Sequence, residues 1–393
     1  MDDLLSLHVM IEKITLAPYY LTLKIRHALY DKGIKKVHIP EVPTVCVGNI
    51  TAGGTGKTPH TEMILKALLR SDDWGMREIA VLSRGHKRRS KGFQQVDRRG
   101  TADFYGDEPL QIKKKFPGVT VAVDKNRIEG CHFLTHPDEL QTDKKGRKCK
   151  DKEFRPANVI VLDDAFQYRA LKADFNLVLV DWNRPIYKDK LLPFGHLRDL
   201  PERLFHADAV IVTKCPVYLE DWERIEWLKP LGIINFDPET CQGTDRKGRK
   251  MTVFFTSINY CPLEPVYPDQ GNSRYIYSKM AILFSGIAKD TPLRRYLSDR
   301  YKIVRRFAFP DHYRYTMADI RKINAASKND PTAVVVTTEK DAQRLRDIKK
   351  MPDSLTERIF QVPIQVAFLT EQEQEIFENH LLTALRRRRT ESI

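Results

Sequence analysis

The sequence predicts an α/β fold in which a mostly parallel β-sheet carries helices on both faces. Short, uncharged apolar runs alternate with helical patterns along most of the chain, which is typical of parallel strands buried on both sides. The same alternation begins again near residue 279 on a smaller scale. We therefore expect a large sheet domain, a second and smaller α/β/α domain, and an N-terminal amphipathic helical segment.

The helical segment is expected over residues 1–40. Charged residues, among them Lys24 and Arg26, interrupt its apolar run, so no stretch reaches the roughly 20 apolar residues that span a bilayer. Pro18 is expected to kink or divide the helix. Two interpretations stay open: a helix that covers the core of the first domain, or a helix that lies in a membrane interface with its basic side chains at the lipid headgroups.

The large domain is expected over residues 41–250. Its predicted strands are the short, mostly β-branched runs at 44–47, 79–83, 119–123, 159–162, 177–180 and 210–213. Its clearest predicted helices lie at 59–70 and 128–134. A basic insert at 143–152 interrupts the pattern, and its composition indicates a solvated surface loop.

Prolines weaken the pattern after residue 216, and a linker with short β structure is expected over 251–278. The second domain then covers residues 279–393. Its predicted strands are 280–285 and 333–338, and its predicted helices are 291–299, 316–327 and 371–385.

Residues 47–59, VGNITAGGTGKTP, form the clearest functional motif. They match the phosphate-binding P-loop pattern G-x-x-x-x-G-K-[ST], except that Thr51 replaces the first Gly. Glycines let backbone N–H groups approach phosphate oxygens, and the following helix adds its N-terminal dipole. Lys57 would reach the β- and γ-phosphates, and Thr58 would hold Mg²⁺. We therefore expect a P-loop NTPase-like domain in which ATP contacts Thr51, Gly53, Gly54, Thr55, Gly56, Lys57 and Thr58.

Residues 159–169, VIVLDDAFQYR, form a second motif. Four apolar residues end in Asp163 and Asp164, which fits a central strand that delivers carboxylates to the carboxyl edge of the sheet. Carboxylate oxygens there can hold Mg²⁺ directly or through water. The run therefore predicts the metal-binding strand that accompanies a P-loop.

Two loops carry candidate acid–base residues. In 106–109, GDEP, Asp107 or Glu108 could accept the proton of an acceptor hydroxyl, although the same residues also suit the first turn of a helix. His312, next to Asp311 in a Pro-led loop, is a candidate acid–base partner. Arg198, in a Gly-led loop, could bind a phosphate or pair with an acid.

The charge balance favours an anionic partner without naming one. Lys and Arg number 66 against 52 Asp and Glu, a formal net charge of +14. A nucleic-acid ATPase is the least favoured class, because no segment interleaves aromatic and basic residues. The stronger alternative is a P-loop GTPase or metallochaperone-type regulatory NTPase. Residues 212–216, VTKCP, faintly resemble the guanine-reading motif [NT]KxD, with Pro216 in place of its Asp.

Together these motifs resemble the tetraacyldisaccharide 4′-kinase family, the lipid A kinases of Gram-negative bacteria. The resemblance runs in the family's order from about residue 44 to 346, and a Thr at the P-loop start is itself a family trait. It is carried by VGNITAGGTGKTP, SRGHKRRSKG, GDEP, DDAFQYR, LLPFGHLRD, FFTSI, LFSGIA, FPDHYRYT and TTEKDAQRL. Ala165 and Tyr168 stand where the family usually has Gly and His.

The resemblance implies an ATP- and Mg²⁺-dependent kinase that phosphorylates the 4′-hydroxyl of a tetraacyldisaccharide 1-phosphate in lipid A biosynthesis. It assigns the catalytic base to Asp107 and its partner, from the second domain, to His312, while Lys57 holds the triphosphate. The metal would be held by Thr58, Asp163 and Asp164. The remaining residues expected to line the active site are Arg84, Glu108, Gln167 and Arg198.

The resemblance also implies a cellular location. Its members are monotopic or peripheral enzymes at the cytoplasmic face of the inner membrane, which favours the interfacial interpretation of the N-terminal helix. A base from one domain and a partner from the other would make catalysis depend on domain closure.

Overall fold

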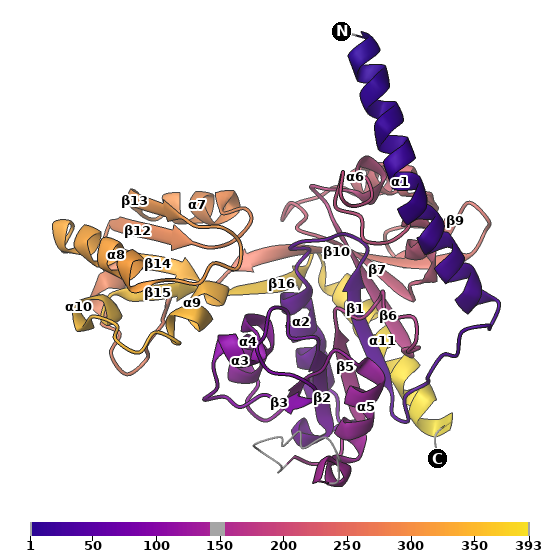
Figure 1. Cartoon of the computed structure of the whole chain (residues 1–393), viewed down its shortest axis with the longest axis horizontal. Helices are drawn as coiled ribbons and strands as arrows, with labels where there is room; N and C mark the ends of the chain where they lie inside the picture. Colours follow the sequence, from indigo (N-terminus) through magenta and orange to yellow (C-terminus); the bar gives the residue numbers. More distant parts are fainter. Residues whose placement is uncertain (1, 142–153, 392–393) are drawn as a thin grey trace. The chain divides into compact units, whose positions relative to one another are not determined.

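The computed structural model describes the backbone of residues 2–141 and 154–391, and the side chains of 16–140 and 154–390. The basic insert predicted at 143–152 lies outside the described residues. The chain divides into two compact units (Figure 1). The first unit comprises Met1–Arg84, Gly118–Ile258 and Val366–Ile393, and the second comprises Gly85–Pro117 and Asn259–Gln365.

The boundaries of these units differ from those of the segments expected from the sequence. Gly85–Pro117, expected within the P-loop domain, packs with the second unit. Val366–Ile393, expected within the second domain, belongs to the first. Both segments join their units through contacts between residues far apart in the chain, which local sequence patterns do not report.

Strand β1 (Thr44–Asn49) is buried at every position and lies between two parallel neighbours, β5 (Val159–Asp163) and β6 (Phe175–Asp181). The sheet of the first unit continues on both sides in the order β4-β2-β5-β1-β6-β7-β10-β9-β8. The pairs from β4 to β10 are parallel, which confirms the predicted mostly parallel sheet. The other strands are β2 (Ile79–Ser83), β4 (Thr120–Val123), β7 (Ala209–Thr213), β8 (Ile233–Asp237), β9 (Gln242–Asp245) and β10 (Lys250–Tyr260).

The helices of the first unit include the N-terminal one, which is continuous through Pro18. Of the two effects expected of Pro18, a kink or a division, the division does not occur. Within the described residues, no helix is both long and apolar enough to cross a membrane. The helices are α1 (Asp2–Asp31), α2 (Lys57–Arg70), α5 (Arg127–Thr135), α6 (Asp221–Leu228) and α11 (Glu371–Glu391).

The stretch from residue 216 onward is more regular than its prolines suggest. Helix α6 is followed by β8, β9 and β10, which pair antiparallel and extend the sheet beyond β7. The segment 251–278, expected as a linker, thus begins with a long strand of the first sheet. A proline prevents a strand only where its missing backbone N–H would be needed for pairing, and β10 contains no proline.

The second unit is a smaller sheet with a hydrophobic core on each face. Successive residues of β12 alternate between the two cores: Ile282 and Phe284 lie in one, and Ala281 and Leu283 in the other. Residues of α8 and α9 complete the first core, and residues of α7 complete the second, which gives the expected α/β/α layering. The sheet order is β11-β15-β14-β12-β13.

The elements of the second unit have the following bounds. Its strands are β3 (Gln94–Gln95), β11 (Glu264–Pro265), β12 (Met280–Ser285), β13 (Lys302–Ala308), β14 (Val334–Thr338) and β15 (Ile359–Val362), and β16 (Ile364–Phe368) runs across the boundary into the first unit. Its helices are α3 (Ala102–Tyr105), α4 (Asp107–Lys115), α7 (Thr291–Ser298), α8 (Met317–Asn329), α9 (Glu339–Leu345) and α10 (Asp353–Thr356).

Helix α11 closes the core of the first unit with Phe377, which is fully buried. Its ring centroid lies 6.5 Å from that of Phe175, 5.3 Å from that of Phe254 and 5.1 Å from that of Phe368. We expect Phe377→Ala to lower the free energy of unfolding by about 3–5 kcal/mol, because the cavity cannot refill. Urea unfolding would measure the loss, and Phe377→Leu should cost much less. Equal losses for the two variants would contradict this packing role.

Candidate functional site

The P-loop lies at the carboxyl end of β1 and leads directly into α2. Gly53 and Gly56 have φ values of 93° and 88°, a region that side-chain-bearing residues rarely adopt. Gly56 is also the N-cap of α2, so Lys57 and Thr58 stand in its first turn. The loop thus presents backbone N–H groups, a helix N-terminus and a lysine together, as anion binding requires.

Two buried side chains that were not among the predicted site residues, Asn49 and His60, support this loop. Nδ2 of Asn49 donates to Oγ1 of Thr55 at 2.6 Å. His60 lies 2.7 Å from the carbonyl oxygen of Gly56 through Nδ1 and 3.1 Å from Oγ1 of Thr256 through Nε2. Burial lowers the pKa of His60 to about 4, so its ring is neutral at pH 7 and acts as a hydrogen-bonding brace.

Strand β5 places the two adjacent aspartates in different environments. Asp163 is almost fully buried and accepts hydrogen bonds from Ser83 at 3.1 Å and Thr61 at 3.5 Å. Asp164, with a φ of 53°, turns towards the P-loop lysine: its Oδ1 lies 3.7 Å from Nζ of Lys57. The structure therefore brings the lysine and the second aspartate together, as the motifs predict.

Asp164 is held ionised by its neighbours. Burial alone would raise its pKa, but the charge of Lys57 and the hydrogen bond and charge of Arg198 outweigh it and lower the pKa to about 2. Nη2 of Arg198 lies 2.8 Å from Oδ1 of Asp164. Arg198 also donates to the side-chain oxygen of Asn49. Here Arg198 pairs with an acid at the edge of the P-loop strand.

The N-terminal helix contacts the same loops. Tyr19 of α1 donates to the carbonyl oxygen of Arg198 at 3.0 Å, and Arg26 donates to that of Gln167 at 2.7 Å. Gln167 in turn donates to the backbone of Asn49. The helix is therefore fixed to the loops that carry two of the predicted site residues. The last predicted residue of this unit, Arg84, follows β2 directly and is exposed.

The donor set of this unit suits magnesium. Thr58, Asp163 and Asp164 offer only oxygen atoms, which Mg²⁺ prefers over nitrogen or sulfur. Asp164 keeps its negative charge at neutral pH, as a ligand must. The residues present therefore fit the ion that the motifs imply.

A second group of predicted residues lies in the second unit, around Asp107 at the start of α4. Nδ1 of His312 lies 3.2 Å from Oδ2 of Asp107, and Arg344 donates to the same oxygen. Burial alone would raise the pKa of Asp107. The hydrogen bond from His312 and the charges of Lys340 and Arg344 nevertheless hold it well below its usual range. The carboxylate is thus ionised and paired while its side chain is only 8% exposed.

Lys340 and Arg344 are site residues that the sequence reading did not select. Both come from α9, one turn apart, so their side chains share a helix face. Lys340 pairs with Glu108, and Arg344 also contacts Asp341 at 2.8 Å. Thr338 caps α9 by accepting from the N–H of Asp341. The sequence signal that could have identified them is the spacing of Lys340 and Arg344, which lie four residues apart just after the capping residue.

The fold explains why these residues meet. Strand β12 lies between β13, which follows it in the chain, and β14, so the winding direction of the sheet reverses beside β12. Side chains gather at the carboxyl edge of such a reversal. The loop after β12 contributes Gly286, whose N–H donates to Asp341 at 3.0 Å and whose carbonyl accepts from the N–H of His312 at 3.3 Å.

The expectation that the base and its partner come from different domains is wrong for the compact units seen here. Asp107 belongs to Gly85–Pro117, which packs in the same unit as His312. The contact of α4 with α9 holds that segment in place. The pairing of Asp107 with His312 is therefore internal to the second unit and does not itself require domain closure.

The ionised, buried Asp107 should give the second unit a pH-dependent stability. We expect Asp107→Asn to destabilise it by about 3 kcal/mol at neutral pH, because the buried guanidinium of Arg344 loses its counter-charge. The folded pKa of Asp107 lies below the ordinary value of 3.8, so this contribution is present above that value and is lost as the pH falls through the folded pKa. In urea unfolding, the difference in free energy of unfolding between wild type and variant should therefore stay constant from about pH 7 down to about pH 4 and narrow as the pH falls further. A gap that does not narrow would refute the charged pairing, and Asp311→Asn, at a more exposed neighbour, is the matched control.

Comparison with known proteins shows the family of this chain. The sequence matches the family model described as tetraacyldisaccharide-1-P 4′-kinase over residues 13–386. The tetraacyldisaccharide 4′-kinase of Parabacteroides distasonis is 34% identical and aligns over 94% of this chain and 93% of its own length. That of Porphyromonas gingivalis is 35% identical over 95% and 96% of the two chains.

The fold is likewise shared with a solved structure. A crystal structure of the LpxK protein of Aquifex aeolicus in complex with ATP aligns with a TM-score of 0.65, covering 95% of this chain and 99% of that one at 24% identity. With a family model that covers nearly all of the sequence and relatives aligned from end to end, the chain belongs to the tetraacyldisaccharide-1-P 4′-kinase family.

Proposed function

We propose that this chain transfers the γ-phosphoryl group of ATP to the 4′-hydroxyl of a tetraacyldisaccharide 1-phosphate, as its family name indicates. The observation that carries the proposal is the buried, ionised Asp107 paired with His312. A P-loop alone serves many NTPases, whereas an alcohol acceptor needs a carboxylate to take its proton.

The residues divide the work between phosphate binding and proton acceptance. Lys57 and the backbone N–H groups of the P-loop bind the β- and γ-phosphates. As the acceptor oxygen bonds to the γ-phosphorus and the bond to the ADP oxygen breaks, the hydroxyl proton passes to Asp107. The low pKa of Asp107 means that it takes the proton late, when the hydroxyl has become acidic. His312 and Arg344 keep its carboxylate oriented.

The proposed reaction also uses Mg²⁺. Thr58 with Asp163 or Asp164 would hold Mg²⁺, which would neutralise part of the negative charge on the transferring phosphates. Asp164 also pairs with Lys57 and Arg198, so these two cations keep it oriented towards the P-loop.

The GTPase alternative receives no support from the resemblance at 212–216. Lys214 pairs with Asp181 at 2.6 Å, and Pro216 offers no side chain that could accept from a guanine base. Membership in a kinase family favours ATP with an alcohol acceptor.

The proposal is tested by incubating the purified chain with radiolabelled ATP and tetraacyldisaccharide 1-phosphate. We expect label in the lipid, and we expect Asp107→Ala to lower kcat about 10²- to 10⁴-fold with ATP affinity unchanged, because the proton acceptor is lost while the P-loop is intact. Asp311→Asn, which leaves the base in place, should retain most activity. Near-normal turnover of Asp107→Ala would remove Asp107 from the mechanism. Hydrolysis of GTP without the lipid would instead support the regulatory NTPase.

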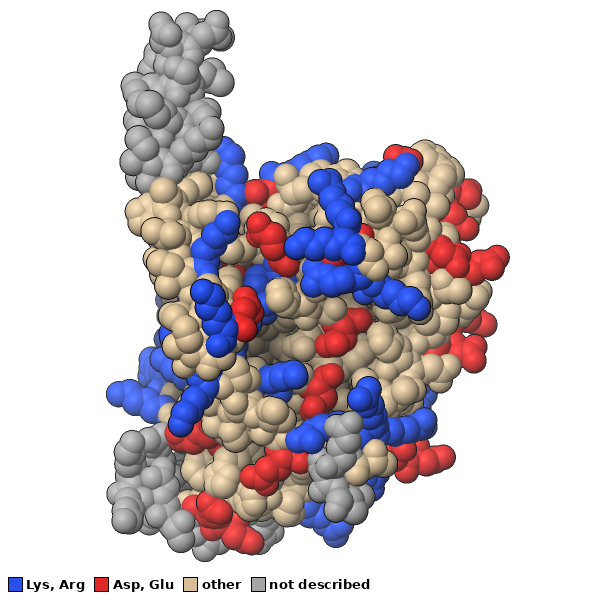
Figure 2. Space-filling view, turned by 90° about the vertical axis from the view of Figure 1, so that its right-hand side faces the viewer, with Lys and Arg blue, Asp and Glu red and all other residues tan. Residues whose placement is uncertain are grey.

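We further propose that α1 docks the enzyme on the cytoplasmic face of the inner membrane. Leu23 and His27 of this helix are buried, while Leu21 and Ile25 are 57% and 52% exposed on another face beside Lys24. Exposed apolar residues next to a cation suit an interface between headgroups and acyl chains. The net charge of +14 adds a general attraction, although Figure 2 shows Asp and Glu side chains among the Lys and Arg side chains of the face in view.

Membrane docking predicts a specific loss. Leu21→Glu combined with Ile25→Glu should sharply lower binding to anionic phospholipid vesicles in a flotation assay, because both apolar contacts are replaced by charges that the lipid repels. The control is Val217→Glu with Tyr218→Glu, which adds the same charges at exposed apolar positions elsewhere in the first unit. If both double variants lose binding equally, net charge rather than the helix face governs docking.

A further inference from the structure

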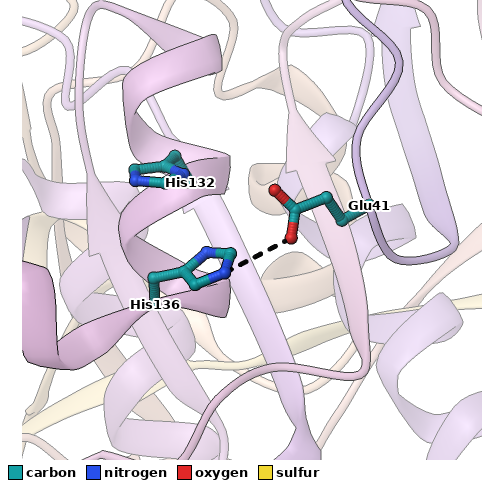
Figure 3. Close-up of side chains that lie close together, drawn as sticks. All are labelled: Glu41, His132 and His136. Carbon is teal, nitrogen blue, oxygen red and sulfur yellow. Dashed lines mark ion pairs between the residues drawn. The ribbon is translucent and has the colours of Figure 1, made fainter.

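Outside the site described so far, the carboxyl end of α5 carries two histidines, His132 and His136, four residues apart. Glu41, in the segment that leads into β1, faces them (Figure 3). One potential ligand atom from each of the three residues lies within 4.8 Å of the others. All three belong to the first unit.

Each histidine has a hydrogen-bonding partner at one of its two ring nitrogens. Nε2 of His132 lies 2.6 Å from a carboxylate oxygen of Glu139. Nδ1 of His136 lies 2.9 Å from the hydroxyl of Thr135, which can itself donate to the carbonyl oxygen of His132 at 3.0 Å. These contacts favour a proton on Nε2 of His132 and on Nδ1 of His136. Carboxylates and neutral oxygens play this orienting role behind metal-bound histidines.

With the protons so placed, Nδ1 of His132 and Nε2 of His136 each carry a lone pair and are the nitrogens that could bind a metal. Nε2 of His136 lies 3.5 Å from Oε2 of Glu41, so an imidazole lone pair and a carboxylate oxygen face each other. The two imidazole rings are also stacked, with centroids 4.7 Å apart and an angle of 27°. The lone pair on Nε2 of His136 and the carboxylate oxygen of Glu41 repel each other unless a proton or a cation lies between them.

We propose that Glu41, His132 and His136 bind one divalent transition-metal cation, with Zn²⁺ as the best match. Two imidazoles and a carboxylate suit Zn²⁺, Ni²⁺ or Cu²⁺, whereas Mg²⁺ and Ca²⁺ prefer oxygen-only sites. Three protein ligands leave a position for water, as in open zinc sites. Glu139 orients His132 and is not itself a required ligand.

The site is separate from the phosphate-binding loop. Glu41 precedes the amino end of β1, while the P-loop follows its carboxyl end, and a strand of this length spans roughly 20 Å. The cation would join α5 to the segment that enters β1, so its expected effect is on the stability of the first unit.

The test is isothermal titration of the full chain with ZnCl₂, without ATP and with excess MgCl₂ present to occupy oxygen-only sites. We expect one Zn²⁺ per chain bound with micromolar affinity. The combined His132→Gln and His136→Gln change should weaken binding at least about tenfold. Asp138→Asn, at an exposed acid beside the cluster, should leave the affinity unchanged.

Thermal unfolding gives an independent readout. Zn²⁺ should raise the melting temperature of wild type and of Asp138→Asn but not that of the double histidine variant, whose metal-free melting temperature should match wild type because both rings are partly exposed. Absence of binding in the wild type, or equal binding by the double variant, would overturn the proposal. In that case His136 and Glu41 form an ordinary ion pair with a protonated imidazole.

Discussion

The complete burial of β1 is the constraint on which the first unit depends. A strand with no exposed residue needs a neighbour on each side, and here both neighbours are parallel, so the carboxyl ends of β1 and β5 meet at one edge. That edge places the P-loop beside Asp164. Close packing also explains Gly48, where a Cβ would come within 2.4 Å of the Cβ of Phe166. Thr51 forms an antiparallel bridge with Leu197, an extended backbone that does not need glycine.

Carboxylates with little exposure to solvent organise both groups of predicted residues. Asp164 is balanced by Lys57 and Arg198, and Asp107 by Arg344 and His312. A buried carboxylate without such partners would take up a proton and could not serve as ligand or base. Asp164 and His312 also hold φ values of 53° and 59°, which cost about 1–3 kcal/mol each in residues other than glycine. Their surrounding contacts must offset this strain.

The two ends of the chain are fastened to the first unit by polar contacts. His27 of α1 lies 2.6 Å from Asp199, and the C-terminal helix pairs Arg386 with Asp73 at 2.8 Å and Arg388 with Asp174 at 3.3 Å. The pair of Arg386 with Asp73 is partly exposed and therefore weak, and we expect the buried side chains of Phe377, Leu381 and Leu385 to supply most of the attachment of α11.

The sequence by itself determined the α/β class, the strands of the parallel sheet and the phosphate-binding loop. Each of these rests on a local pattern: apolar runs must be buried, and Gly-Lys-Thr between a strand and a helix has few other uses. Asp107 and His312 were candidates from their loop motifs, and the family resemblance assigned their roles. Only the tertiary structure decided that 85–117 packs in the second unit and that Arg344 and Lys340 balance the acids there. Those pairs join residues more than 200 positions apart, and which surfaces meet over such distances depends on the packing of the whole sheet.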